Sequence, residues 1–303
     1  MKVLIITGGT SPERRISLMS AKQVKKGLEE SGHKVKLFDL KKGRLELKNL
    51  TRNFDVIFPV LHGEEGESGE LQEFLLTFRK PFVGGDPKGF KKGWYKIPFK
   101  KFCEQENILT ASWKKVKNQD NILRFSFPCV LKSSSGGSSK EVVILKSAKD
   151  LKSKLCKYLL NSGLDLFIEK FLLGTEVTVA ILDNKALPVI EIVPPKGNWF
   201  DFKNKYSGQT KEIPNAPSLD ETTKKLVQKI SLQIHQKLNL GPYSRIDFIV
   251  SEKIPYVLEV NTIPGLTSQS LFPKAAKAAG ITFPEVLDKI IRIAHANKIP
   301  KTK

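Results

Sequence analysis

The chain of 303 residues is poor in cysteine, with only Cys103, Cys129 and Cys156. Their number is odd, their spacing is wide, and no histidine lies close to them in the sequence. A disulfide framework needs paired cysteines and a zinc site needs closely spaced ligands, so neither is indicated. We expect all three to be buried free thiols.

Long apolar runs are also missing. The first run, Val3 to Ile6, ends before Gly8-Gly9 and is too short for the apolar region of a signal peptide. No stretch approaches the ~18 consecutive apolar residues that span a bilayer. The sequence therefore predicts a cytoplasmic protein without a membrane partner.

Arginine is scarce beside lysine, although the formal net charge is +20. Lysines such as Lys22, Lys88, Lys152 and Lys277 are scattered along the chain and not clustered. Arginine is the residue that reads bases and grips phosphates with two donors. We therefore expect no nucleic-acid partner and attribute the charge excess to a solvated surface.

The length allows two or three domains, and 40% hydrophobic with 27% charged residues is typical of a globular protein. A strand at the start, a helix over residues 11–32 and strands over 33–40 and 54–63 form a βαβ pattern. This order predicts a parallel sheet with functional groups where its strands end.

Three groups fall at these strand ends: Gly8-Gly9, Glu13 and His62. We expect Ser11 to cap the helix and Pro12 to occupy its first position. Glu13 is equally explained as a favourable charge at a helix N-terminus, and His62 as an ordinary loop histidine. A domain boundary is expected near Gly84-Gly85.

Beyond this boundary, a strand carries Lys132 into the loop SSSGGSS. Backbone N–H groups and hydroxyls in such a loop suit polyphosphate binding, although a flexible hairpin tip has the same composition. Glu169 and Lys170 end a later strand, where they could read a purine edge. Residues 199–217 show little periodicity, and a connection of this length is usually a functional lid.

A hairpin at residues 245–261 carries the strongest local signal. Ile246, Phe248 and Val250 share one face of the first strand, and Tyr256, Leu258 and Val260 share one face of the second. With SEKIP as a five-residue connector, Val250 pairs with Tyr256, Asp247 faces Glu259, and Arg245 faces Asn261.

Two opposed carboxylates repel, and a divalent cation such as Mg²⁺ relieves the repulsion by accepting carboxylate and amide oxygens. The hairpin therefore predicts a metal site; incidental charge on a half-exposed sheet is the alternative. After the hairpin, Gly265 precedes a helix that begins near serines 268–270. A glycine amide beside a helix N-terminus can donate to an anion or an oxyanion.

These segments together resemble the D-alanine–D-alanine ligase family of the ATP-grasp superfamily. The resemblance runs along nearly the whole chain and is carried by GGTSPER, LHGEEGESGELQ, VLK before SSSGGSS, IEKFLLGTEVTVAIL, KYSG, RIDF and LEVNTIPGLTSQSL. It implies an α/β (α+β) fold of three domains. These are a Rossmann-like parallel sheet (1–84), a central ATP-binding domain (85–172) and a catalytic domain (173–303) with the lid at 199–217. ATP would be held between the last two domains.

The resemblance also implies roles for individual residues. For ATP, these are Lys96, Lys132 and Lys205 at the phosphates, Glu169, Lys170 and Leu172 at adenine, and Glu176 at ribose. Asp247, Glu259 and Asn261 match the ligands of two Mg²⁺ (or Mn²⁺) ions. Around the two D-alanines, Glu13 would hold the first ammonium with Ser138 and Tyr206 linked to it, and His62 would lie near the first carboxylate. Ser270 and the Leu271 amide would fix the second carboxylate, and Arg245 with Gly265 would form the oxyanion hole.

The implied activity is ATP-dependent ligation of two D-alanines for peptidoglycan precursors by a homodimer. Two departures stand out: Tyr95 replaces the usual Asp before Lys96, and Glu141 replaces the last glycine of the phosphate loop. The family shows Arg-Glu-Gly-Ser-Ser-hydrophobic-Gly over 135–141. We therefore expect an active enzyme with weakened ATP affinity. A carboxylate–amine ligase for another amino-acid pair and a degenerate nucleotide-binding protein are the alternatives.

Overall fold

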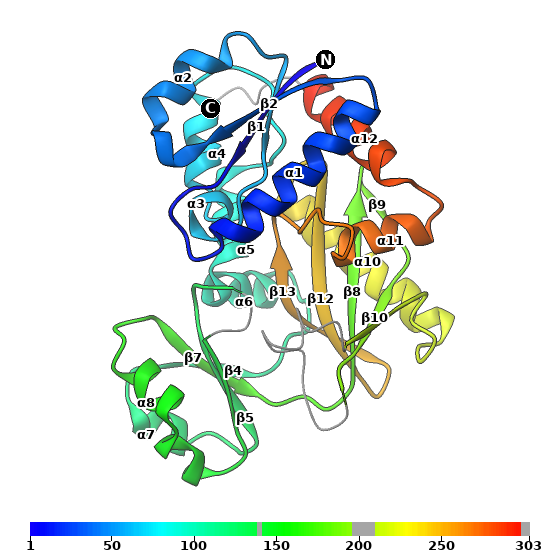
Figure 1. The fold of residues 1–303 in the computed structure, drawn as a ribbon. Coiled ribbons are helices and arrows are strands. Elements are labelled where there is room, and N and C mark those ends of the chain that lie inside the picture. Colours follow the sequence, from blue (N-terminus) through cyan, green and yellow to red (C-terminus); the bar gives the residue numbers. More distant parts are fainter. Residues whose placement is uncertain (138–140, 196–209, 298–303) are drawn as a thin grey trace.

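The computed structural model describes residues 1–137, 141–195 and 210–297. Three sheets organise the chain, and Figure 1 shows the four-stranded sheet as a lobe set apart from the other two. One sheet is parallel and the other two are antiparallel. The predicted mixture of a parallel sheet with α+β units is confirmed.

The first sheet has the order β2-β1-β3 and is parallel throughout. Its strands are β1 (Lys2–Thr7), β2 (Lys34–Asp39) and β3 (Val56–Pro59), and β1 is buried from Val3 to Thr7. The helical elements around it are α1 (Arg14–Glu30), η1 (Leu40–Lys42), α2 (Arg44–Thr51), α3 (Glu64–Glu67) and α4 (Glu70–Leu76). The expected βαβ order is therefore confirmed.

The predicted start of α1 is wrong by two to three residues. The helix begins at Arg14 with Glu13 as its N-cap, and no side chain caps it. The Ser11 hydroxyl donates to the His62 carbonyl at 3.0 Å and accepts from the Glu13 N–H at 3.2 Å. Ser11 thus joins the two strand-end loops instead of capping the helix, because its hydroxyl is engaged by the His62 carbonyl after β3 and by the Glu13 N–H before the helix.

The four-stranded sheet has the order β4-β7-β5-β6 and is antiparallel. Its strands are β4 (Trp113–Val116), β5 (Cys129–Ser133), β6 (Val142–Leu145) and β7 (Leu166–Lys170). One face packs on α7 (Gln119–Leu123), η2 (Ala148–Lys152) and α8 (Lys154–Leu160). On the other face, Val130, Lys132 and Ile144 line a cavity.

The large sheet follows the order β11-β10-β8-β12-β13, with β9 beside β8. Its strands are β8 (Thr175–Leu182), β9 (Lys185–Ala186), β10 (Ile190–Val193), β11 (Lys211–Pro214), β12 (Tyr243–Ser251) and β13 (Ile254–Asn261). The helices α5 (Pro87–Trp94), α6 (Lys96–Gln105) and α10 (Glu221–Lys237) pack on one face, and α11 (Leu271–Ala278) and α12 (Phe283–Ala296) lie against the other.

The β12–β13 hairpin is only partly as predicted. Asp247 faces Glu259 and Arg245 faces Asn261, as expected, but Val250 faces Pro255 and not Tyr256. The connector has two residues, because Ser251 already pairs with Ile254, and Glu252 and Lys253 take the positive φ angles of a tight hairpin turn. A β-bulge after Asp247 restores the predicted register at the carboxylates.

The bulge also changes which residues of β13 face the core. Val257 and Val260 are buried, whereas Tyr256 and Leu258 are only partly buried. The prediction that Tyr256, Leu258 and Val260 share an apolar face is therefore wrong for the first two. On β12 the predicted face of Ile246, Phe248 and Val250 is confirmed.

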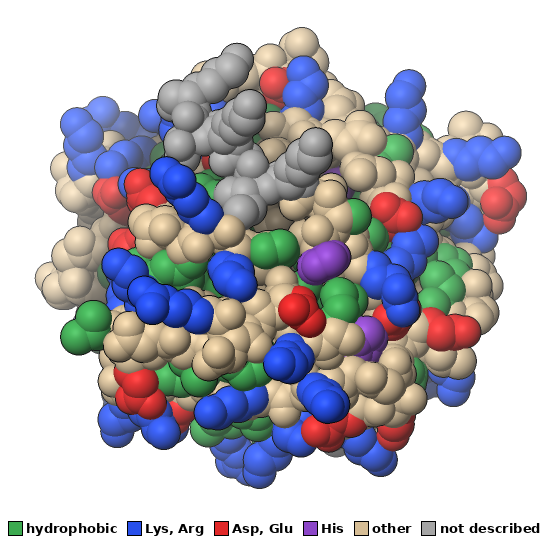
Figure 2. Space-filling view, turned by 90° about the horizontal axis from the view of Figure 1, so that it is seen from above, with side chains coloured by type: hydrophobic (Ala, Val, Ile, Leu, Met, Phe, Trp, Pro, Cys, Tyr) green, Lys and Arg blue, Asp and Glu red, His purple; other side chains and the backbone are tan. Residues whose placement is uncertain are grey.

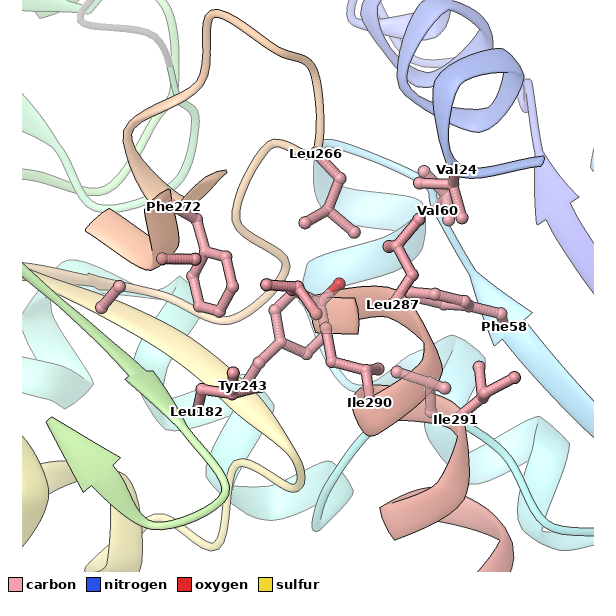
Figure 3. Packing of buried hydrophobic residues seen from close by; sticks show 14 of the residues in the cluster. Val24, Phe58, Val60, Leu182, Tyr243, Leu266, Phe272, Leu287, Ile290 and Ile291 are labelled. Atoms are coloured by element: carbon pink, nitrogen blue, oxygen red, sulfur yellow. The ribbon is translucent and has the colours of Figure 1, made fainter. Parts of the chain in front are cut away.

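A single hydrophobic cluster joins the parallel sheet to the far side of the large sheet. Figure 3 shows Phe58 and Val60 of the first unit packed near Leu287 and Ile290 of α12, with Tyr243 of β12 beside them. Residues 90–103 of α5 and α6 pack instead in the cluster of β8, β12 and β13. The domain boundaries at 84 and 172 stay predictions.

Other expectations concern the surface and the thiols. All three cysteines are free and buried, as predicted. No described helix is long and apolar enough to cross a membrane. Lysine and arginine side chains are spread over the face in Figure 2 with acidic residues among them.

Candidate active site

Two cavities open between the structural units and meet at a common wall. The first, of about 450 Å³, lies between the four-stranded sheet and the large sheet. The second, of about 660 Å³, lies between the parallel-sheet unit and the large sheet. Lys96, Gly136, Gly137 and Glu259 line both. A group bound in the first cavity can therefore reach a group bound in the second.

The first cavity has apolar walls with charged groups at one end. Val130 and Ile144 come from one sheet, Ile249 and Leu258 from the other, and Phe171 from the segment between β7 and β8. Two apolar walls with a narrow polar edge suit a flat aromatic base. The residues expected at adenine, ribose and phosphate line this cavity: Lys96, Lys132, Glu169, Lys170, Leu172 and Glu176.

Glu169 is buried and holds two lysines. It is the cross-strand partner of Val130, so Lys132, two residues further along β5, points to the same face. Lys132 Nζ lies 2.5 Å from one carboxylate oxygen, and Lys100 Nζ lies 2.5 Å from the other. Burial alone would raise the pKa of Glu169, but the two ammonium groups outweigh it and hold the pKa below its usual range.

Lys96 stands where the two cavities meet. It is the first residue of α6, and its ammonium donates to the Gly136 carbonyl at 2.8 Å and lies 3.6 Å from Glu259. Tyr95, which departs from the family pattern, donates its hydroxyl to Glu64 at 2.8 Å. Burial and the Glu64 carboxylate raise the pKa of Tyr95 to about 12, so it stays neutral.

The expected metal ligands converge at the base of the hairpin. Asp247 and Glu259 are register partners, and Asn261 follows two residues after Glu259. Asp247 accepts two hydrogen bonds from Arg245, at 2.8 and 2.9 Å, and one from Thr178 at 2.5 Å. Arg245 and Lys96 therefore offset the repulsion between the carboxylates.

The residues present fit a hard divalent cation. The amide oxygen of Asn261 is buried and has no hydrogen-bond partner in the described part of the chain. This unbonded amide oxygen and the two neighbouring carboxylates together provide the oxygen ligands that Mg²⁺ or Mn²⁺ binds. Among the described residues no cluster of three His, Cys, Asp or Glu side chains exists, so an ion here would use the amide and substrate oxygens.

Arg245 faces the second cavity with its guanidinium held by Asp247. Burial would lower the pKa of Arg245, but Asp247, Glu259 and Glu67 together raise it, so the cation persists. Gly265 lies close by, and a Cβ added there would come within 2.7 Å of the Ser270 hydroxyl oxygen. That oxygen also contacts the Thr267 hydroxyl at 2.8 Å. Ser270 and Leu271 line the same cavity, and their role at a carboxylate stays a prediction.

The opposite wall of the second cavity carries Glu13 and His62. A Cβ on Gly137 would approach a Glu13 oxygen to 3.2 Å, so Gly137 lies against this carboxylate. His62 is buried, and its Nε2 lies 3.1 Å from the Ser20 hydroxyl. Burial is the main reason that the pKa of His62 is lowered to about 4, so the ring is neutral near pH 7.

Sequence reasoning missed Glu67, which also lines this cavity. One of its oxygens accepts the Gly63 N–H at 2.9 Å. Burial, with Glu13 nearby, raises the pKa of Glu67 to about 8, although hydrogen bonds from Gly63 and Ile263 act against the shift. The segment GEEGESG contains several glutamates and no periodicity, so the sequence gives no sign of which one is buried.

Three predicted residues, Ser138, Lys205 and Tyr206, lie outside the described residues, as does most of the proposed lid at 199–217. The described end of that segment places Thr210 and Glu212 on the second cavity. The roles expected for these three residues stay predictions.

The first cavity lies between two antiparallel sheets. One sheet carries the Lys132–Glu169 pair, and the other carries the paired carboxylates Asp247 and Glu259. This arrangement is that of a nucleotide-dependent ligase of the ATP-grasp fold. Comparison with known proteins specifies the family. The family model described as D-ala D-ala ligase C-terminus matches residues 93–292. The chain belongs to the D-alanine–D-alanine ligase family.

Similar proteins span the full length. A D-alanine–D-alanine ligase of Maridesulfovibrio salexigens is 36% identical over 98% of this chain and 100% of its own. One of Clostridium beijerinckii is 36% identical over 96% of this chain and 98% of its own. The crystal structure of the Bacillus anthracis ligase complexed with ATP superposes with a TM-score of 0.84 at 31% identity, covering 97% of each chain.

Proposed function

We propose that the two cavities hold the two halves of one reaction, the ATP-dependent joining of two D-alanines into D-alanyl-D-alanine for peptidoglycan precursors. The observation that carries this proposal is the wall that the cavities share, where Lys96 and Glu259 lie 3.6 Å apart. A phosphoryl group that leaves ATP in the first cavity can there meet a carboxylate bound in the second. The family membership supports the choice of substrates.

The first step activates a carboxylate. An oxygen of the first D-alanine attacks the γ-phosphorus, the bond to the β-phosphate oxygen breaks, and ADP leaves with D-alanyl phosphate formed. Charge accumulates on the phosphoryl oxygens, and the ammonium groups of Lys96 and Lys132 stabilise it. Lys205 is proposed to join them. Glu13 is proposed to hold the ammonium of this D-alanine, with Ser138 and Tyr206 linked to it.

Asp247, Glu259 and Asn261 are proposed to hold two Mg²⁺ or Mn²⁺ ions. Bound there, the ions neutralise phosphate charge during transfer. Arg245 orients Asp247 by donating to both of its oxygens, and Thr178 donates to Oδ1 as well. These contacts orient the ligand in the way that hydrogen-bonded neighbours orient metal ligands generally.

The second step forms the peptide bond. The amine of the second D-alanine attacks the acyl carbon, the tetrahedral oxyanion forms and collapses, and inorganic phosphate leaves as the amine loses a proton. Arg245 and the Gly265 amide are proposed to donate to the oxyanion. Ser270 and the Leu271 amide are proposed to hold the second carboxylate, and His62 is proposed to lie near the first. A closed lid would exclude water and protect the acyl phosphate.

Glu169, Lys170 and Leu172 are proposed to read adenine, and Glu176 the ribose. The three-domain division at 84 and 172, a homodimer and a cytoplasmic location complete the proposal. Phosphate release measured with ATP and D-alanine, L-alanine or D-lactate tests it. We expect turnover that needs D-alanine; turnover with another amino acid alone would indicate a different ligase, and ATP binding without turnover a degenerate one.

A further inference from the structure

Lys100 is a buried charge that the proposed mechanism does not use. It lies in α6, and only 1% of the residue is exposed. An unpaired ammonium in a protein interior costs several kcal/mol, so a buried lysine persists only where other groups satisfy it. Lys100 is also absent from the lining of the first cavity, so it does not touch a nucleotide directly.

The donors of Lys100 are engaged within the protein. Its ammonium contacts Glu169 at 2.5 Å, the Thr110 hydroxyl at 2.6 Å and, more weakly, the Ala111 carbonyl at 3.4 Å. The ammonium also lies 5.8 Å from the centre of the Phe167 ring. The contact with Glu169 is an ion pair, whereas Thr110 and Ala111 accept hydrogen bonds from the ammonium.

Glu169 connects this buried lysine to the cavity. Each of its oxygens holds one lysine, Lys100 on the inner side and Lys132 on the side of the cavity. The side chain of Lys132 is 17% exposed, whereas that of Glu169 is 3% exposed. The Glu169 carboxylate therefore lies between Lys132, which can contact a phosphate in the cavity, and Lys100, which cannot.

Lys100 also links the two sheets that enclose the cavity. Thr110, which accepts from Lys100, donates to the Val257 carbonyl of β13 at 2.9 Å, and the Leu109 carbonyl accepts from the Val257 N–H at 2.9 Å. Val257 directly precedes Leu258, which lines the first cavity, and Glu259 follows. One ammonium thus connects β7 of the small sheet with β13 of the large one beside the first cavity.

We propose that Lys100 is a positioning residue for ATP: through Glu169 it fixes the Lys132 ammonium, and through Thr110 it fixes the spacing of the two sheets. The inference rests on the proposed use of ATP. Without Lys100, Glu169 has one cation fewer, and its carboxylate is free to turn toward Lys132 or to take up a proton. Lys132 then loses its fixed position in the cavity, and ATP binding weakens while the amino-acid cavity is unchanged.

The decisive variant is Lys100→Met, which retains an unbranched side chain of similar length without charge. We expect the KM for ATP to rise about tenfold or more and kcat to fall with it, because Lys132 also stabilises the transferring phosphoryl group, while the KM for D-alanine stays within about threefold of wild type. Lys101→Met changes the next residue, which is exposed, and is expected to leave all three values unchanged. A KM for ATP equal to that of the control would overturn the proposal and leave Lys100 a structural residue.

Two further variants keep the test decisive if Lys100→Met does not fold. Thr110→Val removes one acceptor of Lys100 and leaves the lysine; we expect a smaller rise in the KM for ATP, about threefold. Lys100→Met combined with Glu169→Gln should raise the KM for ATP above that of Glu169→Gln alone by no more than Thr110→Val does, because the lysine acts only through that carboxylate and Thr110. An unchanged KM for ATP in Thr110→Val, or fully additive effects in the double variant, would contradict the proposal.

The two proposals fail in different ways. Wild-type enzyme without D-alanine-dependent phosphate release would overturn the proposed function. Wild-type turnover with an unaltered KM for ATP in the variants would overturn only the role of Lys100. The melting temperature of each variant shows whether its stability is lost in general. A general loss of stability would not raise the KM for ATP while leaving the KM for D-alanine unchanged.

Discussion

Asp247 and Glu259 face each other across β12 and β13, and each carboxylate is already near a cation of the protein, Arg245 for Asp247 and Lys96 for Glu259. Both carboxylates are therefore positioned by the protein itself, without a bound ligand. Their different burial matters, since the Asp247 side chain is 10% exposed and that of Glu259 37%. Substitutions at the two positions should differ in their effect on folding.

Glu259→Gln should abolish most metal-dependent turnover and leave the fold intact. We expect a loss in kcat of about 100-fold or more, because an amide is a poorer ligand for Mg²⁺ than a carboxylate. The melting temperature should change by less than about 2 °C, since the partly buried ion pair with Lys96 is long, at 3.6 Å, and glutamine keeps the size of the side chain. Turnover against Mg²⁺ concentration, with Glu252→Gln in the hairpin turn as control, checks this. An equal loss of stability and activity would indicate a structural role.

Gly265→Ala should disturb the site of the second carboxylate. The added Cβ would lie 2.7 Å from the Ser270 hydroxyl oxygen, so that side chain must move away from Thr267. We expect kcat/KM for the second D-alanine to fall at least about tenfold. In a Ser270→Ala background the clash disappears, and Gly265→Ala should then cost little more. Independent, additive losses would show that the two positions do not interact.

Glu67→Gln should change how stability depends on pH. The folded protein keeps Glu67 protonated up to a pKa of about 8, whereas the unfolded chain releases the proton near its ordinary value of 4.5. Wild-type stability from this group therefore falls as pH rises from 4.5 towards 8. Glutamine does not ionise, so the variant does not lose this stability. The melting temperature of the variant minus that of wild type should therefore be larger at pH 8 than at pH 5 by about 3 °C or more.

His62 acts in the opposite direction at lower pH, because its pKa is lowered to about 4 and stability from it is lost as pH falls through the range from 6.5 to 4. His62 is present in both proteins, so its contribution cancels when the melting temperature of wild type is subtracted from that of the variant. Glu73→Gln, at an exposed position of α4, is the matched control, and its melting temperature should differ from that of wild type by the same amount at every pH. A flat difference for Glu67→Gln as well would show that Glu67 ionises normally.

Glu141→Gln should improve ATP binding. This carboxylate lines the first cavity and lies so near Gly136 that a Cβ there would meet its oxygen at 2.7 Å. A negative charge beside the phosphate loop opposes a triphosphate, and its removal should lower the KM for ATP about three- to tenfold. Kinetics at saturating D-alanine, with Glu46→Gln on α2 as remote control, measure it. A raised KM would mean that Glu141 helps to hold the nucleotide.

The sequence predicted the pair of Asp247 and Glu259 correctly, and alternation on β12 correctly placed Asp247 on the face opposite Ile246 and Phe248. It was not sufficient to find the two-residue turn, since Glu252 and Lys253 carry no residue preference for positive φ. The wrong turn and the unseen bulge cancelled at the carboxylates. The prediction was therefore right there and wrong at Val250 and Tyr256.

Lys100 and Glu67 were missed because burial of a charge depends on distant partners. Lys100 lies three residues from both Ile97 and Cys103 on the buried side of α6, and a lysine in such an apolar stripe was the available signal. Its partner Glu169 is 69 residues away, and no local pattern connects them. The N-cap of α1 was likewise decided by the carbonyl of His62, beyond the reach of a helix-start rule.

The bulge at Leu258 is the one place where the hairpin holds a residue outside its ladder. Val257 faces Phe248 and Glu259 faces Asp247, so Leu258 between them has no partner of its own. Loss of Leu258 would join Val257 to Glu259 and leave both pairings as they are, with Glu259 still on the face of Asp247. A frame-preserving deletion of this single codon would therefore be milder than replacement of either carboxylate.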